Sequence, residues 1–219
     1  MKLRVIYNYL LVRFGIRQVL PSDYIRSIQV YDNHEPIIAL PPSSILIYDQ
    51  QQKWEARVTV IDKLERVAFK LKEEQGVYIR LLELYRSPEK QQNMRDKQIV
   101  ILQSQNPYLS SEQIALEANK RVSSIGGGHQ TGGAVDLTLC DSKGRSLDMG
   151  TAYDEFNTET PTHAKGLSTI VKKNRRLLLR YMQQEGFANY PNEWWHFCYG
   201  DKMWAAYMHK PHAIYDVII

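Results

Sequence analysis

The sequence predicts an α+β domain in which a small, mainly antiparallel sheet carries helices on one face and a polar cleft on the other. Three observations favour this fold. Apolar residues recur at helical spacing from about Glu55 to Glu74, an apolar strand pattern runs from Ala134 to Cys140, and glycine-rich breaks separate such segments. A chain of 219 residues fits one domain, residues 1–219, with a single core.

The composition is that of an ordinary globular protein, with 43% hydrophobic and 24% charged residues. The formal net charge of +4 comes from interspersed Lys and Arg, without a long basic block that would follow a phosphate backbone. We therefore expect no nucleic-acid partner. The oligomeric state is not readable from the sequence.

The N-terminal apolar stretch from Val5 to Val12 is short and is followed by Arg13 and Arg17, with no small-residue cleavage site behind it. This pattern predicts neither a signal peptide nor membrane insertion, because a span needs about 20 apolar residues. Only Cys140 and Cys198 are present, which suits a reducing compartment. The expected location is the cytoplasm, with the periplasm as the alternative.

The first half of the chain predicts an N-terminal extension followed by alternating helices and one strand. Residues 1–52 are rich in proline and read as short strands and extended connections packed on the core. The helix from about Glu55 to Glu74 should end at Gly76, and the apolar run from Val77 to Tyr85 should be a buried strand. Two further helices are predicted, from Pro88 to about Gln105 and after Ser110, where Ser110 and Gln113 have capping-box spacing. We expect these helices to cover one face of the sheet.

The second half predicts the strand from Ala134 to Cys140, a helix from Leu167 to Glu185 and a strand from Glu193 to Tyr199. Side chains alternate along a strand, so Asp136 should face a polar cleft while Val135 and Leu137 face the helices.

Two segments combine metal-binding side chains with constrained backbone: Gly128 to Asp136, and Glu193 to His196. His129, Asp136 and His196 form a ligand set that zinc accepts, with a fourth position left for water. Bound zinc makes water a nucleophile at neutral pH, and a nearby carboxylate must then move protons. Because Glu193 and His196 lie three residues apart, they share one site only if the strand bends or ends there, which the preceding Pro191 allows.

Each of these residues also has an ordinary structural interpretation. A lone His is usually a surface or hydrogen-bonded residue, a lone Asp in a strand often lies at a turn or an edge, and the pair Trp194 and Trp195 is most simply core. The combination of the two segments favours a metal site over these separate interpretations.

The two segments, in this order, resemble the D-alanyl-D-alanine dipeptidase and carboxypeptidase family of zinc enzymes, and most closely its vancomycin-resistance type dipeptidases. The Tyr85-Arg86 pair and the run from Met149 to Asp154 also match, so the resemblance extends over a catalytic core of residues 77–199. It implies one Zn²⁺ per chain and a small peptide or muropeptide as the substrate.

The resemblance also implies residue roles. His129, Asp136 and His196 would hold the metal, Glu193 would act as general base and then acid, and Arg86 would stabilise the oxyanion. Asp154, Tyr153 and Gly127 would lie on the substrate side, with Asp154 pairing with the free ammonium group. Without the resemblance, a salt bridge for Arg86 and a helix cap for Asp154 would be the simpler interpretations. Gly127 is a departure, since the family commonly has Ser there, and this puts the substrate selectivity in doubt.

These observations predict zinc-dependent hydrolysis of a D-Ala-D-Ala type dipeptide. One alternative is a D,D- or L,D-carboxypeptidase or endopeptidase that acts on peptidoglycan stem peptides. Another is a zinc-containing module that binds peptides without cleaving them, although such a module would not need a base beside its metal. Cys140 and Cys198 are predicted to be buried, unpaired thiols, with close approach of the two beneath the site as the alternative.

Overall fold

The computed structural model describes residues 19–122 and 127–218, and it confirms the predicted α+β class. The apolar stretch from Val5 to Val12 and the first glycine of the predicted break, Gly126, lie outside these residues. None of the described helices is long and apolar enough to cross a bilayer.

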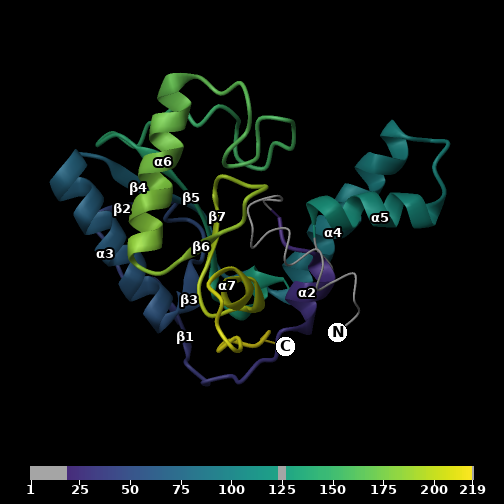
Figure 1. Cartoon of the computed structure of the whole chain (residues 1–219), viewed down its shortest axis with the longest axis horizontal. Helices are drawn as coiled ribbons and strands as arrows, with labels where there is room; N and C mark the ends of the chain where they lie inside the picture. Colours follow the sequence, from purple (N-terminus) through teal and green to yellow (C-terminus); the bar gives the residue numbers. More distant parts are fainter. Residues whose placement is uncertain (1–18, 123–126, 219) are drawn as a thin grey trace.

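The central sheet has five strands in the order β2-β4-β5-β7-β6 (Figure 1). β2 runs parallel to β4, and the other neighbouring pairs are antiparallel, so the sheet is mainly antiparallel as predicted. The strand bounds are Leu46–Ile47 (β2), Tyr78–Glu83 (β4), Ala134–Cys140 (β5), His196–Cys198 (β7) and Ala188–Asn189 (β6).

Helices α3 (Val58–Gln75) and α6 (Thr169–Gln184) pack on one face of this sheet and on each other. Their buried apolar residues form the main core with Val135, Leu137 and Leu139 of β5. The alternation of β5 therefore directs Asp136 and Thr138 to the opposite face. Gly76 ends α3 in the left-handed conformation, with φ of 64°, as the sequence predicted.

A second, two-stranded sheet pairs β1 (Ile37–Ala39) with β3 (Glu55–Arg57) in antiparallel register. The helix predicted from about Glu55 therefore begins three residues later, at Val58. The reason is a long-range contact, because strand pairing with β1 and the hydrogen bond from Arg57 N–H to Gly132 O at 3.1 Å hold these residues extended.

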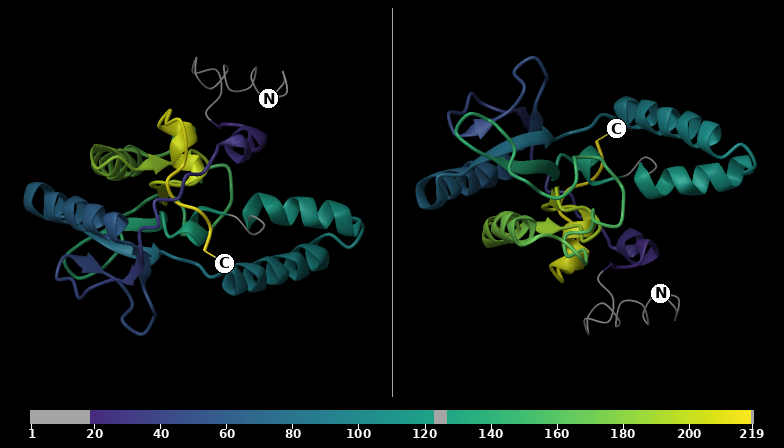
Figure 2. Two further views of the ribbon diagram at one scale, coloured as in Figure 1. Left: turned by 90° about the horizontal axis from the view of Figure 1, so that it is seen from below. Right: turned by 90° about the horizontal axis from the view of Figure 1, so that it is seen from above.

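Helices α4 (Pro88–Gln105) and α5 (Ser111–Arg121) follow the predicted bounds closely, and Ser110 and Gln113 form the predicted capping box. Their predicted place on the sheet is wrong. The two helices pack against each other around Leu102, Ile114 and Ala118 and project from the body as a hairpin (Figure 2). The physical reason is that α4 buries only Gln91 and Leu102, too small an apolar stripe to cover a sheet.

The N-terminal segment contains an unpredicted short helix, α2 (Ser22–Ser27), in addition to the expected short strands. It packs against α7 (Lys202–Tyr207), which follows the last strand of the sheet (Figure 1). Residues near the start of the described chain therefore lie beside residues near its end.

Arg57 connects distant segments of the chain through hydrogen bonds. It is 3% exposed, and its guanidinium donates to the backbone carbonyl oxygens of Thr131 (2.8 Å), Asp216 (3.2 Å) and Glu35. We expect Arg57→Ala to lower the free energy of unfolding by about 2–4 kcal/mol, because it leaves the carbonyl of the buried Thr131 and two partly buried carbonyls without their donors. Urea unfolding measures this loss. Arg66→Ala, at a side chain that is 51% exposed, is the matched control and should cost less than about 1 kcal/mol; equal losses would contradict the prediction.

Candidate metal centre

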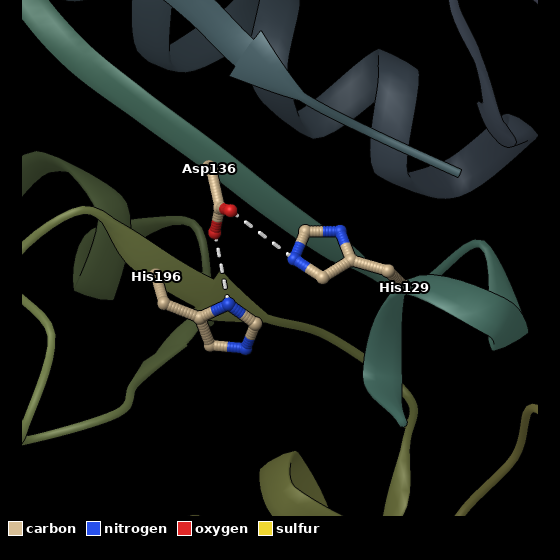
Figure 3. Close-up of side chains that lie close together, drawn as sticks. All are labelled: His129, Asp136 and His196. Carbon is tan, nitrogen blue, oxygen red and sulfur yellow. Dashed lines mark hydrogen bonds and ion pairs between the residues drawn. The ribbon is translucent and has the colours of Figure 1, made fainter. Parts of the chain in front are cut away.

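His129, Asp136 and His196 converge from three different segments of the chain (Figure 3). One carboxylate oxygen of Asp136 lies 3.3 Å from Nε2 of His129, and the other lies 2.9 Å from Nδ1 of His196. All three residues are buried, and one ligand atom from each lies within 4.8 Å of the others. The structure thus brings together the three side chains that the sequence singled out.

His129 is delivered by a short 3-10 helix, Gly128–Thr131, that ends at Gly132 in the left-handed conformation, with φ of 72°. Its ring is oriented by a contact of 2.7 Å between Nδ1 and the carbonyl oxygen of Leu84. A carbonyl oxygen only accepts, so Nδ1 donates to it, and Nε2 is the ring nitrogen on the side of Asp136. The backbone N–H of Arg86 also donates to His129 O at 3.2 Å, so the segment that follows β4 holds this turn.

Gly128 is required by close packing. A Cβ atom there would overlap Oδ2 of Asp201 and come within 3.1 Å of Ala134 Cβ. Gly128→Ala should therefore shift the turn that carries His129, destabilise the fold by about 1–3 kcal/mol and weaken zinc binding about 10–100-fold. Competition with a zinc-binding dye, alongside urea unfolding, measures both effects; unchanged zinc affinity would contradict the inference that this contact positions His129.

Asp136 and His196 face each other as a register pair on β5 and β7. Burial would raise the pKa of Asp136, but the imidazoles of His129 and His196 more than offset it and hold this pKa well below its usual range. Burial disfavours the charged form of His196, yet its hydrogen bond to Asp136 raises its pKa to about 9. The site therefore stabilises positive charge beside a buried carboxylate.

Glu193 was expected in a strand, but it lies in a tight turn just before β7, which begins at His196. Glu193 N–H donates to Tyr190 O at 3.0 Å, and the side-chain amide of Asn189 donates to the carbonyl oxygens of Glu193 (3.1 Å) and His196 (2.9 Å). This turn brings Glu193 to the same cleft as His196, as the spacing argument required. Burial raises the pKa of Glu193 to about 7, with Asp136 and Asp154 adding to the shift and His196 opposing it.

The cleft around these residues has a volume of about 330 Å³. Arg86, Tyr153, Asp154 and Gly127, the other residues predicted for the site, all line it. The Tyr153 hydroxyl donates to Asp136 Oδ2 at 3.0 Å. Burial, together with the charge of Asp136, raises the pKa of Tyr153 far above its usual range. Asp154 has an uncommon positive φ of 61°. Trp194 and Trp195 are buried in the main core, as predicted, and Trp195 also lines the cleft.

Several residues of this region escaped the sequence analysis. Asn189 organises the Glu193 turn, Asp201 packs against Gly128, and Glu83 contacts Arg86. Leu20 and Ile25 of the N-terminal extension also line the cleft. No local pattern marks these residues, because each acts through a contact with a segment far away in the sequence or across a bend.

The donor set fits zinc. Ligand atoms at about 2.0–2.2 Å from a tetrahedral ion lie about 3.3–3.6 Å from one another. The separation of 3.3 Å between His129 Nε2 and Asp136 Oδ2 is close to this value. The contact from His129 Nδ1 to a backbone carbonyl is also the outer contact that zinc-binding imidazoles usually make.

The two cysteines lie near opposite ends of β5, Cys140 on β5 itself and Cys198 on the neighbouring β7, and they do not approach each other. Cys140 is the last residue of β5 and pairs with Tyr78, whereas Cys198 pairs with Ala134 at the first residue of β5. Six residues of strand separate these positions by about 20 Å. Both thiols are buried and free, so the alternative of close approach beneath the site is wrong.

Comparison with known proteins identifies relatives by sequence. The chain is 35% identical over 101 residues to a D-alanyl-D-alanine dipeptidase of Synechocystis sp., which covers 41% of each chain. It is 38% identical over 73 residues to that of Escherichia coli, covering 33% of this chain and 38% of the other, and 36% identical over 70 residues to that of Enterococcus faecalis, covering 32% and 35%. The matches thus span about two fifths of the length of these curated relatives or less.

Solved structures share the fold at lower identity. The vancomycin-resistance D,D-pentapeptidase VanY, solved as a mutant in complex with Zn(II), has a TM-score of 0.51 and 19% identity over 87% of this chain and 96% of its own. The LD-carboxypeptidase LdcB also has a TM-score of 0.51 and 19% identity, over 82% of this chain and 74% of its own. At this identity the likeness shows the fold alone.

The profile of the peptidase M15 family, described as D-Ala-D-Ala dipeptidase, matches residues 45–217. This range includes the whole five-stranded sheet, strand β3 of the two-stranded sheet, and the helices that cover the central sheet. It also includes His129, Asp136, His196 and Glu193. The chain therefore belongs to the peptidase M15 family of D-Ala-D-Ala dipeptidases.

Proposed function

We propose that this protein hydrolyses a dipeptide of the D-Ala-D-Ala type, with one Zn²⁺ held by His129, Asp136 and His196 and with Glu193 as the general base. The observation that carries the proposal is the buried His-Asp-His set on the same cleft as a carboxylate whose pKa is raised to about 7. A general base works best when its pKa lies near the operating pH. Family membership and the Zn(II) in the VanY structure support the choice of metal.

Each residue has a chemical task in this proposal. When bound, zinc supplies Lewis-acid polarisation of the scissile carbonyl and makes water more acidic. Glu193 accepts a proton from the attacking water on a carboxylate oxygen and passes it to the leaving amine nitrogen. Arg86 donates N–H groups to the oxyanion that develops on the carbonyl, since a guanidinium stays charged and has fixed donor directions. Asp154 pairs with the substrate's free ammonium group.

The experiment is a product analysis on a defined panel. The protein is freed of metal with a chelator, reloaded with one equivalent of zinc, and incubated with D,D-, L,D- and L,L-dipeptides and with muropeptides. Mass spectrometry should detect free D-Ala from D-Ala-D-Ala with the reloaded protein and only background with the metal-free protein. Bound peptide without cleavage would instead favour a binding module.

The second candidate is a carboxypeptidase that acts on a peptidoglycan stem peptide. Gly127 favours it, because the missing hydroxyl removes a polar contact from the cleft wall next to the metal centre. Faster release of D-Ala from a pentapeptide than from D-Ala-D-Ala would select this function. The cytoplasmic location predicted from the sequence, with the periplasm as the alternative, stays a proposal, which fractionation of the native cells would test.

A further inference from the structure

Glu83, at the end of β4, is a buried carboxylate next to the metal centre that the proposed mechanism does not use. It is 6% exposed and forms a register pair with Asp136 on β5. Upstream, Ile79 pairs with Leu139 and Leu81 with Leu137, and these four residues face the core. Continued alternation would place Glu83 on the core side as well.

A β-bulge in β4 places Glu83 on the opposite face of the sheet. The register shifts by one residue between Leu81 and Glu83, so that β4 holds one extra residue relative to β5. The shift places Glu83 opposite Asp136, and therefore on the cleft face. Bulges of this kind re-aim side chains and are common next to active sites.

Glu83 is the centre of a small polar network. Its Oε2 atom forms an ion pair with Nη2 of Arg86 and lies 3.4 Å from the hydroxyl of Tyr153. Its Oε1 atom lies 2.9 Å from Nζ of Lys90, a side chain that is 54% exposed. The Tyr153 hydroxyl donates to Asp136 Oδ2, so the network links Arg86 to a metal-binding residue through two side chains.

The guanidinium of Arg86 is held at two of its three nitrogens. Nη2 contacts Glu83, and Nη1 donates to Gln91 Oε1 at 2.9 Å. Nε is buried and has no acceptor among the described residues. A buried donor without an acceptor is costly, and a substrate oxygen would satisfy it.

We propose that Glu83 is a positioning residue that holds the Arg86 guanidinium so that its unpaired N–H faces the substrate carbonyl. This inference rests on the proposed function of Arg86. The Glu83 and Arg86 side chains are 7% and 11% exposed, so the pair differs from the exposed ion pairs that contribute little. Glu83 acts through Arg86 and does not touch the reacting atoms.

A double-mutant cycle tests this role. Glu83→Gln should lower kcat about 10–100-fold with a smaller change in KM, because Arg86 acts mainly on the transition state. In an Arg86→Ala background the same substitution should change kcat less than about 3-fold, since its target is gone. Glu89→Gln is the matched control, because Glu89 is exposed in the first turn of α4 and does not line the cleft, and its kcat should equal that of the wild type. An equal loss from Glu83→Gln in both backgrounds would overturn the inference.

A second measurement needs no turnover. In ¹⁵N NMR spectra of the zinc-loaded protein, hindered rotation of the Arg86 guanidinium should give separate Nη signals, assigned by their loss in Arg86→Lys. Glu83→Gln should average these signals, whereas Glu89→Gln should leave them separate. Identical Arg86 signals in wild type and Glu83→Gln would reject the positioning role. If the wild type cleaves no peptide of the panel while the NMR result holds, the proposed function fails and the positioning role stands.

Discussion

Glu193→Gln is expected to lower kcat about 10²–10⁴-fold while the protein keeps its zinc. Glutamine has nearly the same shape as glutamate but cannot take the proton of the attacking water. Glu193 stands outside the His129, Asp136 and His196 set, so the metal site should be unaffected. Steady-state kinetics on D-Ala-D-Ala and zinc content by atomic absorption measure the two quantities on the same sample.

The matched control for this variant is Glu73→Gln, at an exposed position of α3 on the far side of the core. It removes the same negative charge, so its kcat should equal that of the wild type. If Glu193→Gln turns over substrate at the wild-type rate, Glu193 is not the base. If it loses zinc together with activity, its role lies in the structure of the β7 turn.

His196→Ala is expected to bring both zinc content and turnover to background. Two protein ligands would remain, one fewer than catalytic zinc sites ordinarily have. The variant also removes one of the two imidazoles that stabilise the buried charge of Asp136, which should cost about 3–5 kcal/mol of stability. Zinc content and kcat are measured at a temperature where circular dichroism shows the variant to be folded.

His163→Ala serves as the control for histidine loss, because His163 is exposed and does not line the cleft. It should keep one zinc per chain and normal turnover. A folded His196→Ala protein that still binds one zinc with full activity would show that the metal is held elsewhere.

Local signals in the sequence predicted much of the fold. The apolar alternation of β5, the cap at Ser87 followed by Pro88, and the Ser110 capping box specify their elements through neighbours only a few residues away. These features could be read without any knowledge of the rest of the chain.

Features that depend on distant contacts were not predictable in the same way. Strand β3 pairs with β1, which makes α3 begin at Val58, and the α4–α5 hairpin projects from the body. Both features depend on which distant segments pack against each other. The β4 bulge is a single extra residue, Leu82, within an apolar run, so no pattern from Val77 to Tyr85 predicted that Glu83 would lie on the Asp136 side of the sheet. For the same reason the site was predicted through its metal-binding side chains, while Glu83 and Asn189 were missed.

The register pairing of Asp136 with His196 means that the ligand set does not exist before the sheet does. Correct alignment of β5 and β7 places these two donors together, and a slip of one residue would turn one of them away. An ion bound there would therefore connect two strands and the His129 turn, and its binding free energy would stabilise the folded state. Metal supply in the cell would then set how much of this protein persists in the folded state, as well as how much of it can act.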